Sequence, residues 1–504
     1  MKKLIVFTLV VVLEKIKNIT NRNNKLIYLN FLPGFEKWRW YLGQCRTYVE
    51  YLRALKSVPA FGDFASKNTF KVKWNGLTPD ISSLPIIDKD SFVKPYSIDD
   101  RCVNGFLPTK GVVVDESSGS TGKPTCWVRG DFERKQNKRM IEFGIKHNYG
   151  DERLFIINAF AMGAWATGVN VTMSCVDISL LKSLGPDQQK IENTMKEFGP
   201  NFRYIIMGYP PFLKIMTDQI DIDWESYDVH FIFGGEAMSE TLRQHLLNKG
   251  IKSVRSSLGA SDLELNIALE SDFTIELRKK VHENPNLAEA LLGYPGPTPM
   301  VFQYNPSEFF METTEEGELV ISICRPGYLA PKVRYNLHDK AEILRKHEFI
   351  AKLESCGMSL DDFENEMQLD LPILLHYGRS DMTVSYFGSN IAPGDVNDSL
   401  CQIESFADQF QTFRLKTFED KNANKQLKIY VELHEGNKPS SYNSKTLRSQ
   451  LIENLAKNNQ DFREALSMMP ESAYPTLELC PAGHKIFGDN DIRIKLKYIE
   501  DSAA

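Results

Sequence analysis

The sequence predicts an α/β fold made of two domains. Between about residues 111 and 260, short β-branched and aromatic runs alternate with amphipathic helical stretches, a pattern typical of parallel βαβ units. From about 300 to 345 the pattern becomes rich in strands, and a compact mixture of strands and helices follows later. At 504 residues the chain exceeds one usual domain. We therefore expect a large N-terminal domain with parallel βαβ sheets at 1–379 and a small, mobile α+β domain at 380–504.

Local patterns predict the individual elements. The stretch Gln188–Phe198 is amphipathic, and another helix starts after the capping residue Ser239 and ends at Gly250. A third helix is expected at Ser444–Lys457. The expected strands are Val112–Val114, Phe155–Ile157, Tyr204–Met207, His230–Phe233, Ser253–Ser256, Gly317–Ile323, Lys332–Tyr335, Thr412–Phe418, Leu427–Leu433 and Ile492–Tyr498.

Composition and charge exclude several classes of protein. With 42% hydrophobic and 25% charged residues, the chain is an ordinary globular protein. A net charge of −6, without an arginine-rich run, gives no reason to expect a nucleic-acid partner. The cysteines form no C-x-x-C pair and the histidines no H-x-x-x-H pair, so these spacings do not predict a structural zinc site.

The N-terminus contains the apolar run Leu4–Leu13. The run continues into Glu14 without a small-residue cleavage site, and it is shorter than the roughly 20 residues that span a bilayer. We expect a helix that packs on the body of the protein. The alternative is weak contact with a membrane surface through residues 4–13.

A loop rich in glycine and hydroxyl groups follows the expected strand at 112–114. Its glycines allow close approach of the backbone, its hydroxyls and successive amides suit phosphate oxygens, and its lysine adds positive charge. The P-loop pattern G-x-x-x-x-G-K-[ST] is not met, because Ser117 replaces the first glycine and Pro124 follows the lysine. We interpret the loop as a nucleoside triphosphate site; the alternative is an ordinary surface loop. Its residues are Ser118, Gly119, Ser120, Thr121, Gly122 and Lys123.

Four further motifs follow this loop in a fixed order. They are Gly234-Gly235-Glu236, Ser257–Asp262, Arg334–Asp339 and Gly378-Arg379-Ser380-Asp381. Together with the loop they resemble the adenylate-forming superfamily, which includes acyl-CoA synthetases and the adenylation domains of peptide synthetases. The resemblance spans about residues 55–490. Segments such as Val58–Phe61 and Leu84–Lys89 are similar to the phenylacetate-CoA ligase branch.

The resemblance implies a role for each motif. The loop would hold the β- and γ-phosphates, Gly235 and Glu236 would border the adenine, and Gly259 and Ser261 would lie near the α-phosphate. Asp262 would bind Mg²⁺, a role that suits a carboxylate, although it could instead be a helix cap. Asp339 and Arg379 would bind the ribose; Arg379 could alternatively form a salt bridge between domains. Leu258 departs from the family, which commonly has an aromatic residue there.

Two functional expectations concern the C-terminal domain. The resemblance implies that Asp381 is the hinge and that a lysine near the end of the chain is catalytic. Lys485 follows Pro481-Ala482-Gly483-His484, one residue longer than the family pattern, and Lys495 is the rival.

The resemblance implies AMP-forming activation of a carboxylic acid, with ATP, Mg²⁺ and CoA as co-substrate, in the cytoplasm. The small and aromatic residues of Ala159–Gly168 suggest an apolar or aryl acid rather than an amino acid. A carrier-protein thiol or an amine could replace CoA. The rival from another class is a nucleotide-binding protein that has lost catalysis, motivated by Leu258 and the irregular lysine motif.

Overall fold

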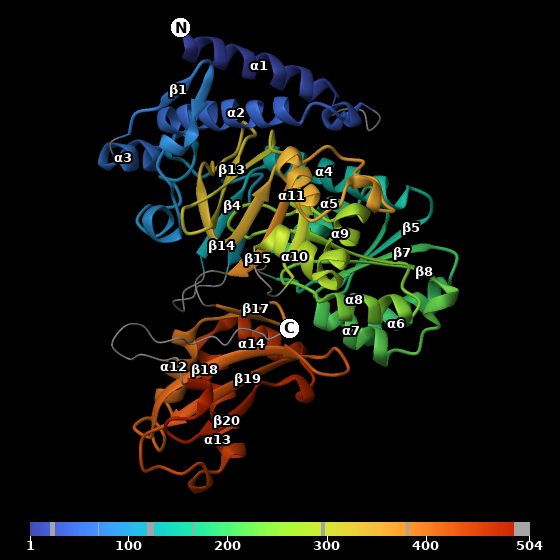
Figure 1. Cartoon of the computed structure of the whole chain (residues 1–504), viewed down its shortest axis with the longest axis vertical. Coiled ribbons are helices and arrows are strands. Elements are labelled where there is room, and N and C mark those ends of the chain that lie inside the picture. The colour runs from blue at the N-terminus through green and yellow to red at the C-terminus, as the bar shows by residue number, and fades with distance from the viewer. Residues whose placement is uncertain are drawn as a thin grey trace.

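The computed structural model describes residues 1–20, 26–68, 70–117, 125–163, 166–293, 298–379 and 383–487. The predicted phosphate-loop residues 118–123, the predicted hinge Asp381 and the rival lysine Lys495 therefore lie outside the described residues. Figure 1 shows a large N-terminal lobe above a smaller C-terminal lobe.

An eleven-stranded sheet forms the centre of the N-terminal lobe. Its strand order is β12-β13-β14-β15-β11-β10-β9-β8-β7-β5-β6. The last five strands of this order are parallel, and all residues of β5 are buried, as expected for strands covered on both faces. These five are β5 (Leu154–Asn158), β6 (Leu180–Ser183), β7 (Arg203–Gly208), β8 (Asp228–Phe233) and β9 (Ser253–Leu258).

Helices connect the parallel strands, as the alternating pattern predicted. The helix α6 occupies the predicted range, begins after Asp187, whose side chain accepts a hydrogen bond from the Lys190 amide, and ends before Gly199. Ser239 caps α8 through a hydrogen bond from the Leu242 amide. The helices of this half are α4 (Asp131–Tyr149), α5 (Ala166–Cys175), α6 (Gln188–Phe198), α7 (Pro210–Gln219) and α8 (Glu240–Asn248).

The other half of the sheet is antiparallel and packs against a second group of helices. Phe273, Leu277 and Phe349 are among the buried residues that join these helices to the sheet. The strands are β10 (Ala268–Leu269), β11 (Met300–Gln303), β12 (Phe309–Thr313), β13 (Glu318–Ile323), β14 (Tyr335–Leu344) and β15 (Ile373–Arg379), and the helices are α9 (Asp272–Glu283), α10 (Pro285–Leu292) and α11 (Lys346–Ser355).

Two sequence-based expectations were wrong in detail. The strand before the phosphate loop, β3 (Val113–Ser117), does not belong to the parallel sheet; it forms a separate antiparallel ribbon with β4 (Thr125–Arg129). The strand expected at Lys332–Tyr335 begins only at Tyr335. Arg334 has a left-handed backbone with φ of 52°, which interrupts an extended strand at this position. Its guanidinium donates hydrogen bonds to the carbonyls of Ser82 and Leu84.

The apolar N-terminal run forms a helix that packs on the body of the protein. In α1 (Lys2–Thr20), Val6 and Val10 are buried against α2 (Glu36–Ser57), and Lys17 pairs with Glu308. Across the described residues, no helix is long and apolar enough to cross a membrane. The neighbouring elements are α3 (Pro59–Lys67), β1 (Lys73–Asn75) and β2 (Thr78–Asp80).

The C-terminal lobe has its own hydrophobic core, formed by residues between 384 and 479. A three-stranded sheet in the order β18-β19-β20 carries α12 (Pro393–Cys401), α13 (Ser444–Asn458) and α14 (Gln460–Met468). The boundary at 379/380 stays a prediction, because residues 380–382 lie outside the described part. The strands of this lobe are β16 (Val384–Tyr386), β17 (Ser389–Ile391), β18 (Phe410–Glu419), β19 (Lys425–Leu433) and β20 (Thr476–Cys480).

The contact between α2 and the sheet edge depends on Gly43. A methyl group at this position would lie 2.2 Å from the Pro306 carbonyl oxygen and 2.6 Å from Cδ2 of Phe310. Backbone and ring must then move apart, so Gly43→Ala should lower the free energy of unfolding by about 1–3 kcal/mol. Denaturant unfolding measures this change. The matched control is Gly62→Ala in α3, where the nearest atom would be 3.8 Å away; equal stability of the two variants would contradict this packing.

Candidate active site

A cavity of about 450 Å³ lies at the carboxyl ends of β8 and β9, where ligands bind in parallel α/β sheets. Segments from four strands line it: Gly234–Ala237 after β8, Arg255–Asp262 at β9, Tyr335–Asp339 in β14, and Gly378-Arg379 in β15. Apart from Arg334, the described residues of all four motifs thus line this one cavity. Ser117, the residue before the predicted phosphate loop, also lines the cavity.

Asp339 presents a free acceptor atom. Its Oδ2 lies 3.0 Å from Nε2 of His376, and its Oδ1 lies 3.7 Å from Nη1 of Arg379. Oδ1 is buried and accepts no hydrogen bond from any residue that the structure describes. Asp339 and Arg379 are cross-strand partners in β14 and β15, which explains why residues forty positions apart meet. A buried carboxylate oxygen without a donor fits a ligand hydroxyl.

Asp262 lines the same cavity. Its Oδ2 accepts a 2.6 Å hydrogen bond from the Tyr335 hydroxyl, and its Oδ1 lies 4.0 Å from Nζ of Lys89. Burial, with a contribution from the Asp262 carboxylate, raises the pKa of Tyr335, so that hydroxyl stays a donor. The neighbouring Ser261 and Gly259 also line the cavity. One oxygen of Asp262 therefore remains to meet a cation.

The entrance to the predicted phosphate loop is fixed at Ser117. Its hydroxyl accepts a 2.7 Å hydrogen bond from Nε1 of Trp127 and a 3.1 Å hydrogen bond from Nζ of Lys89. Lys89 thus links the base of this loop to Asp262. In the sequence, Lys89 belongs to the segment Leu84–Lys89, which is similar to the phenylacetate-CoA ligase branch, and no local pattern indicates its place in the site.

The Gly234-Gly235-Glu236 motif also joins the two lobes. The side chain of Glu236 is buried and pairs with Lys425 of β19. Gly235 has φ of +83°, and a methyl group there would lie 2.5 Å from the Tyr209 ring; one at Gly388, in the C-terminal lobe, would lie 3.0 Å from the same ring. Tyr209 thus packs between glycines from both lobes and lines the cavity.

Lys485 lies away from the cavity. It begins a short 3₁₀ helix, Lys485–Phe487, its side chain is exposed, and it is not part of the cavity lining. Its assignment as the catalytic lysine stays a prediction.

The remaining wall of the cavity is mostly apolar. Within the predicted segment Ala159–Gly168, Phe160, Ala166 and Thr167 line it. Sequence reasoning missed the larger contribution, which comes from one face of α4 and from the strands: Ile141, Ile145, Tyr149, Met207, Ile232 and Leu269.

Lys332 is a buried lysine beneath the site. Its Nζ lies 4.4 Å from the Trp127 ring centroid and 5.5 Å from that of Tyr335. Burial, and to a smaller extent the nearby Arg101, lower the pKa of Lys332 to about 7, whereas Asp262 acts in the opposite direction. No spacing in the sequence indicated this residue.

Comparison with solved structures identifies the fold. The chain is similar to 2-hydroxyisobutyryl-CoA ligase in complex with 2-HIB-AMP and CoA in the thioesterification state, with a TM-score of 0.63, 12% identity, and coverage of 94% of this chain and 91% of that chain. The same ligase in the postadenylation state with R3-HIB-AMP gives a TM-score of 0.51 at 12% identity, with coverage of 94% of this chain and 91% of that chain. Its open conformation gives a TM-score of 0.50 at 12% identity, with coverage of 92% of this chain and 91% of that chain.

The fold prediction is therefore confirmed: the chain has the mixed α/β fold of adenylate-forming enzymes. No family model matches the sequence, and a comparison with curated proteins finds no match. The phenylacetate-CoA ligase branch remains a prediction, and an identity of 12% establishes the fold alone.

Lys332 gives a pH prediction. Between pH 7 and its usual pKa of 10.5, the unfolded chain binds a proton at Lys332 that the folded protein lacks, so stability rises with pH across this window. Each pH unit in this window adds at most about 1.4 kcal/mol to the free energy of unfolding. Lys332→Met should flatten the rise between pH 7 and 9.5, measured by denaturant unfolding. The control is Lys279→Met at an exposed lysine. If the two variants show the same slope, Lys332 is not held neutral by burial.

Proposed function

We propose that the protein activates a carboxylic acid by AMP-forming chemistry. The observation that supports this most strongly is Asp339, which lines the cavity and whose buried Oδ1, beside Arg379, accepts no hydrogen bond from the described residues. Paired with a ribose hydroxyl, this oxygen would gain the donor it lacks. The fold, shared with acyl-AMP-binding ligases, supports the same proposal.

In the first half-reaction, an oxygen of the acid attacks the α-phosphate of ATP. The P–O bond to pyrophosphate breaks, and acyl-AMP and pyrophosphate form. Both reactants are anionic, so positive charge must lie close to them. Lys89 at the base of the loop and Lys123 within it supply that charge, Asp339 and Arg379 orient the ribose, and Gly235 and Gly259 allow close approach of the backbone.

Asp262 is the proposed Mg²⁺ ligand. The fit rests on its Oδ1, which no donor approaches closer than Lys89 at 4.0 Å among the described contacts, whereas Oδ2 is held by Tyr335. When bound, Mg²⁺ would supply positive charge to the phosphates. Tyr335 fixes the orientation of the carboxylate.

The acid is an apolar or aryl carboxylic acid. The wall formed by α4, β7 and β8 is apolar, and two charged side chains that line the cavity are paired within the protein: Arg255 with Asp272 and Glu270 with Arg243. Their charges are thus satisfied without a ligand. Placing an apolar acyl group against this wall costs less desolvation free energy than placing an amino acid there, because the ammonium group of an amino acid needs a polar partner.

The acceptor is a thiol, and CoA is the candidate that the similar structures support. The TM-score is higher with the ligase in its thioesterification state, at 0.63, than with two other structures of the same ligase, at 0.50 and 0.51. Lys485 lies away from the cavity here, which fits an arrangement after adenylation. A boundary at 379/380 with its hinge at Asp381 would let the C-terminal domain rotate and bring Lys485, or its rival Lys495, to the phosphates.

Two alternatives remain for the reaction. A carrier protein or an amine could take the acyl group in place of CoA. A catalytically degenerate nucleotide-binding protein is the alternative that Leu258 favours, since leucine offers no aromatic face to the adenine. Tyr209 weakens this alternative because its ring lines the same cavity beside Gly235.

The proposed location is the cytoplasm, where ATP is available, with a weak membrane-surface contact through residues 4–13. The outer side of α1 supports this contact, since it exposes Leu4, Phe7 and Val12.

Acid-dependent exchange of pyrophosphate into ATP, measured over a panel of carboxylic acids, tests the proposed reaction. We expect exchange with an apolar or aryl acid. Asp262→Ala and Lys89→Ala should each lower it about 10²–10³-fold, because each removes one preorganised charged group. Asp221→Ala, at an exposed aspartate, is the control. Nucleotide binding without exchange for any acid would instead favour the degenerate alternative.

Asp339 gives a prediction about ATP alone. Its contacts to ribose would be the same in the ground and transition states, so Asp339→Ala should raise the KM for ATP and change kcat little. Loss of a hydrogen bond to a charged group corresponds to an increase of about 10–100-fold. Asp339→Asn keeps one acceptor and should show a smaller increase. An unchanged KM at saturating acid would remove Asp339 from the nucleotide site.

A further inference from the structure

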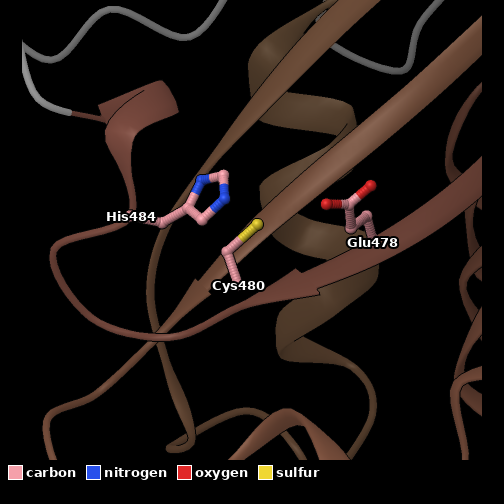
Figure 2. A group of neighbouring side chains, drawn as sticks. All are labelled: Glu478, Cys480 and His484. Atoms are coloured by element: carbon pink, nitrogen blue, oxygen red, sulfur yellow. The ribbon is translucent and has the colours of Figure 1, made fainter.

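Three side chains with metal-binding atoms meet at the end of β20 in the C-terminal lobe. Glu478 and Cys480 are two positions apart on this strand and so lie on the same face of the sheet, and His484 returns to them after a turn (Figure 2). One carboxylate oxygen, the thiol sulfur and one ring nitrogen all lie within 4.8 Å of one another.

The backbone of the turn is fixed by hydrogen bonds that place His484. Gly483 has φ of +75°, and its amide donates a 2.8 Å hydrogen bond to Oε1 of Glu432. Glu432 is the cross-strand partner of Cys480, is buried, and accepts a second bond from Gln411. The His484 amide closes the turn on the Pro481 carbonyl at 3.2 Å.

We infer that Glu478, Cys480 and His484 bind a zinc ion. A thiolate, an imidazole and a carboxylate are the three ligand types that zinc takes in proteins. Ligand atoms of tetrahedral zinc lie about 3.3–3.8 Å apart at the usual bond lengths, so only a small inward rotation of side chains separates the observed cluster from that geometry. Three protein ligands leave the fourth position to water.

Charge around the cluster favours a cation. The buried thiol of Cys480 lies between two carboxylates, those of Glu478 and Glu432, and Lys428 pairs with Glu478. The Lys428 side chain is partly exposed, so it can turn to solvent when a metal takes the Glu478 oxygen. Glu432 acts as the outer carboxylate that holds the turn, a role that often tunes metal affinity.

The site would anchor the start of the final segment of the chain. Lys485, a candidate catalytic lysine, directly follows His484, and two residues further on the Phe487 ring lies 5.7 Å from the Arg414 guanidinium. Binding of zinc at His484 would therefore restrain the backbone that carries Lys485. The spacings C-x-x-C and H-x-x-x-H cannot indicate this site, because it contains one glutamate, one cysteine and one histidine rather than a pair of like ligands.

Titration of the metal-stripped full chain with Co²⁺ tests the inference, independently of any activity. Thiolate-bound Co²⁺ gives a charge-transfer band in the near ultraviolet, and we expect one equivalent per chain, displaced by Zn²⁺. Cys480→Ser should abolish the band, His484→Ala should weaken Co²⁺ binding at least tenfold, and Glu478→Gln should weaken it less. Cys401→Ser, at an exposed cysteine of the same lobe, should change nothing.

Three results would overturn the zinc site. They are no band with the unaltered chain, a band that persists in Cys480→Ser, and loss of the band in Cys401→Ser. Circular dichroism of each variant checks that it is folded. His484 is only partly buried, so His484→Ala retains the core of the lobe and decides the question if Cys480→Ser does not fold.

Discussion

The candidate site depends on one buried guanidinium, that of Arg129. It pairs with Asp115 in the β3–β4 ribbon and donates to the backbone carbonyls of Ser261, at 2.7 Å, and Leu263. Asn170 of α5 donates to both oxygens of the same aspartate, at 3.0 and 3.1 Å. One ion pair thus fixes the ribbon that flanks residues 118–124 against the segment that carries Asp262. Removal of either charge would leave its buried partner uncompensated, which costs several kcal/mol.

Backbone strain occurs beside the proposed ribose site. Arg334 and His338 both have left-handed backbones, with φ of 52° and 58°, although neither is glycine. Side-chain contacts maintain this conformation: Arg334 pairs with Glu312, and Nδ1 of His338 lies 3.1 Å from Glu318. Residues in such conformations cost about 1–3 kcal/mol and persist where the surroundings over-determine them. Here they turn the backbone so that Tyr335 faces Asp262 and Asp339 faces the cavity.

The sequence predicted those parts of the fold that follow from local patterns. The range of α6 and the cap at Ser239 could be predicted because one helix determines them. The pairing of β3 with β4 and the late start of β14 at Tyr335 could not be predicted. Partners that are distant in sequence determine both the strand pairing and the turn at Arg334. In the site, motif order pointed to Asp262 and Asp339, which line one cavity, while their roles stay predictions. Lys89, Lys332 and His376 enter the site only through contacts between elements remote in sequence.

The central claim is that Asp339 and its neighbours hold a nucleotide. A crystal structure of the full chain with AMP tests it without knowledge of the acid. The account predicts a ribose hydroxyl within hydrogen-bond distance of Oδ1 of Asp339, the base beside Gly235 and the phosphate near Ser261. A cavity that stays empty at saturating AMP, or a nucleotide bound elsewhere, would contradict the account.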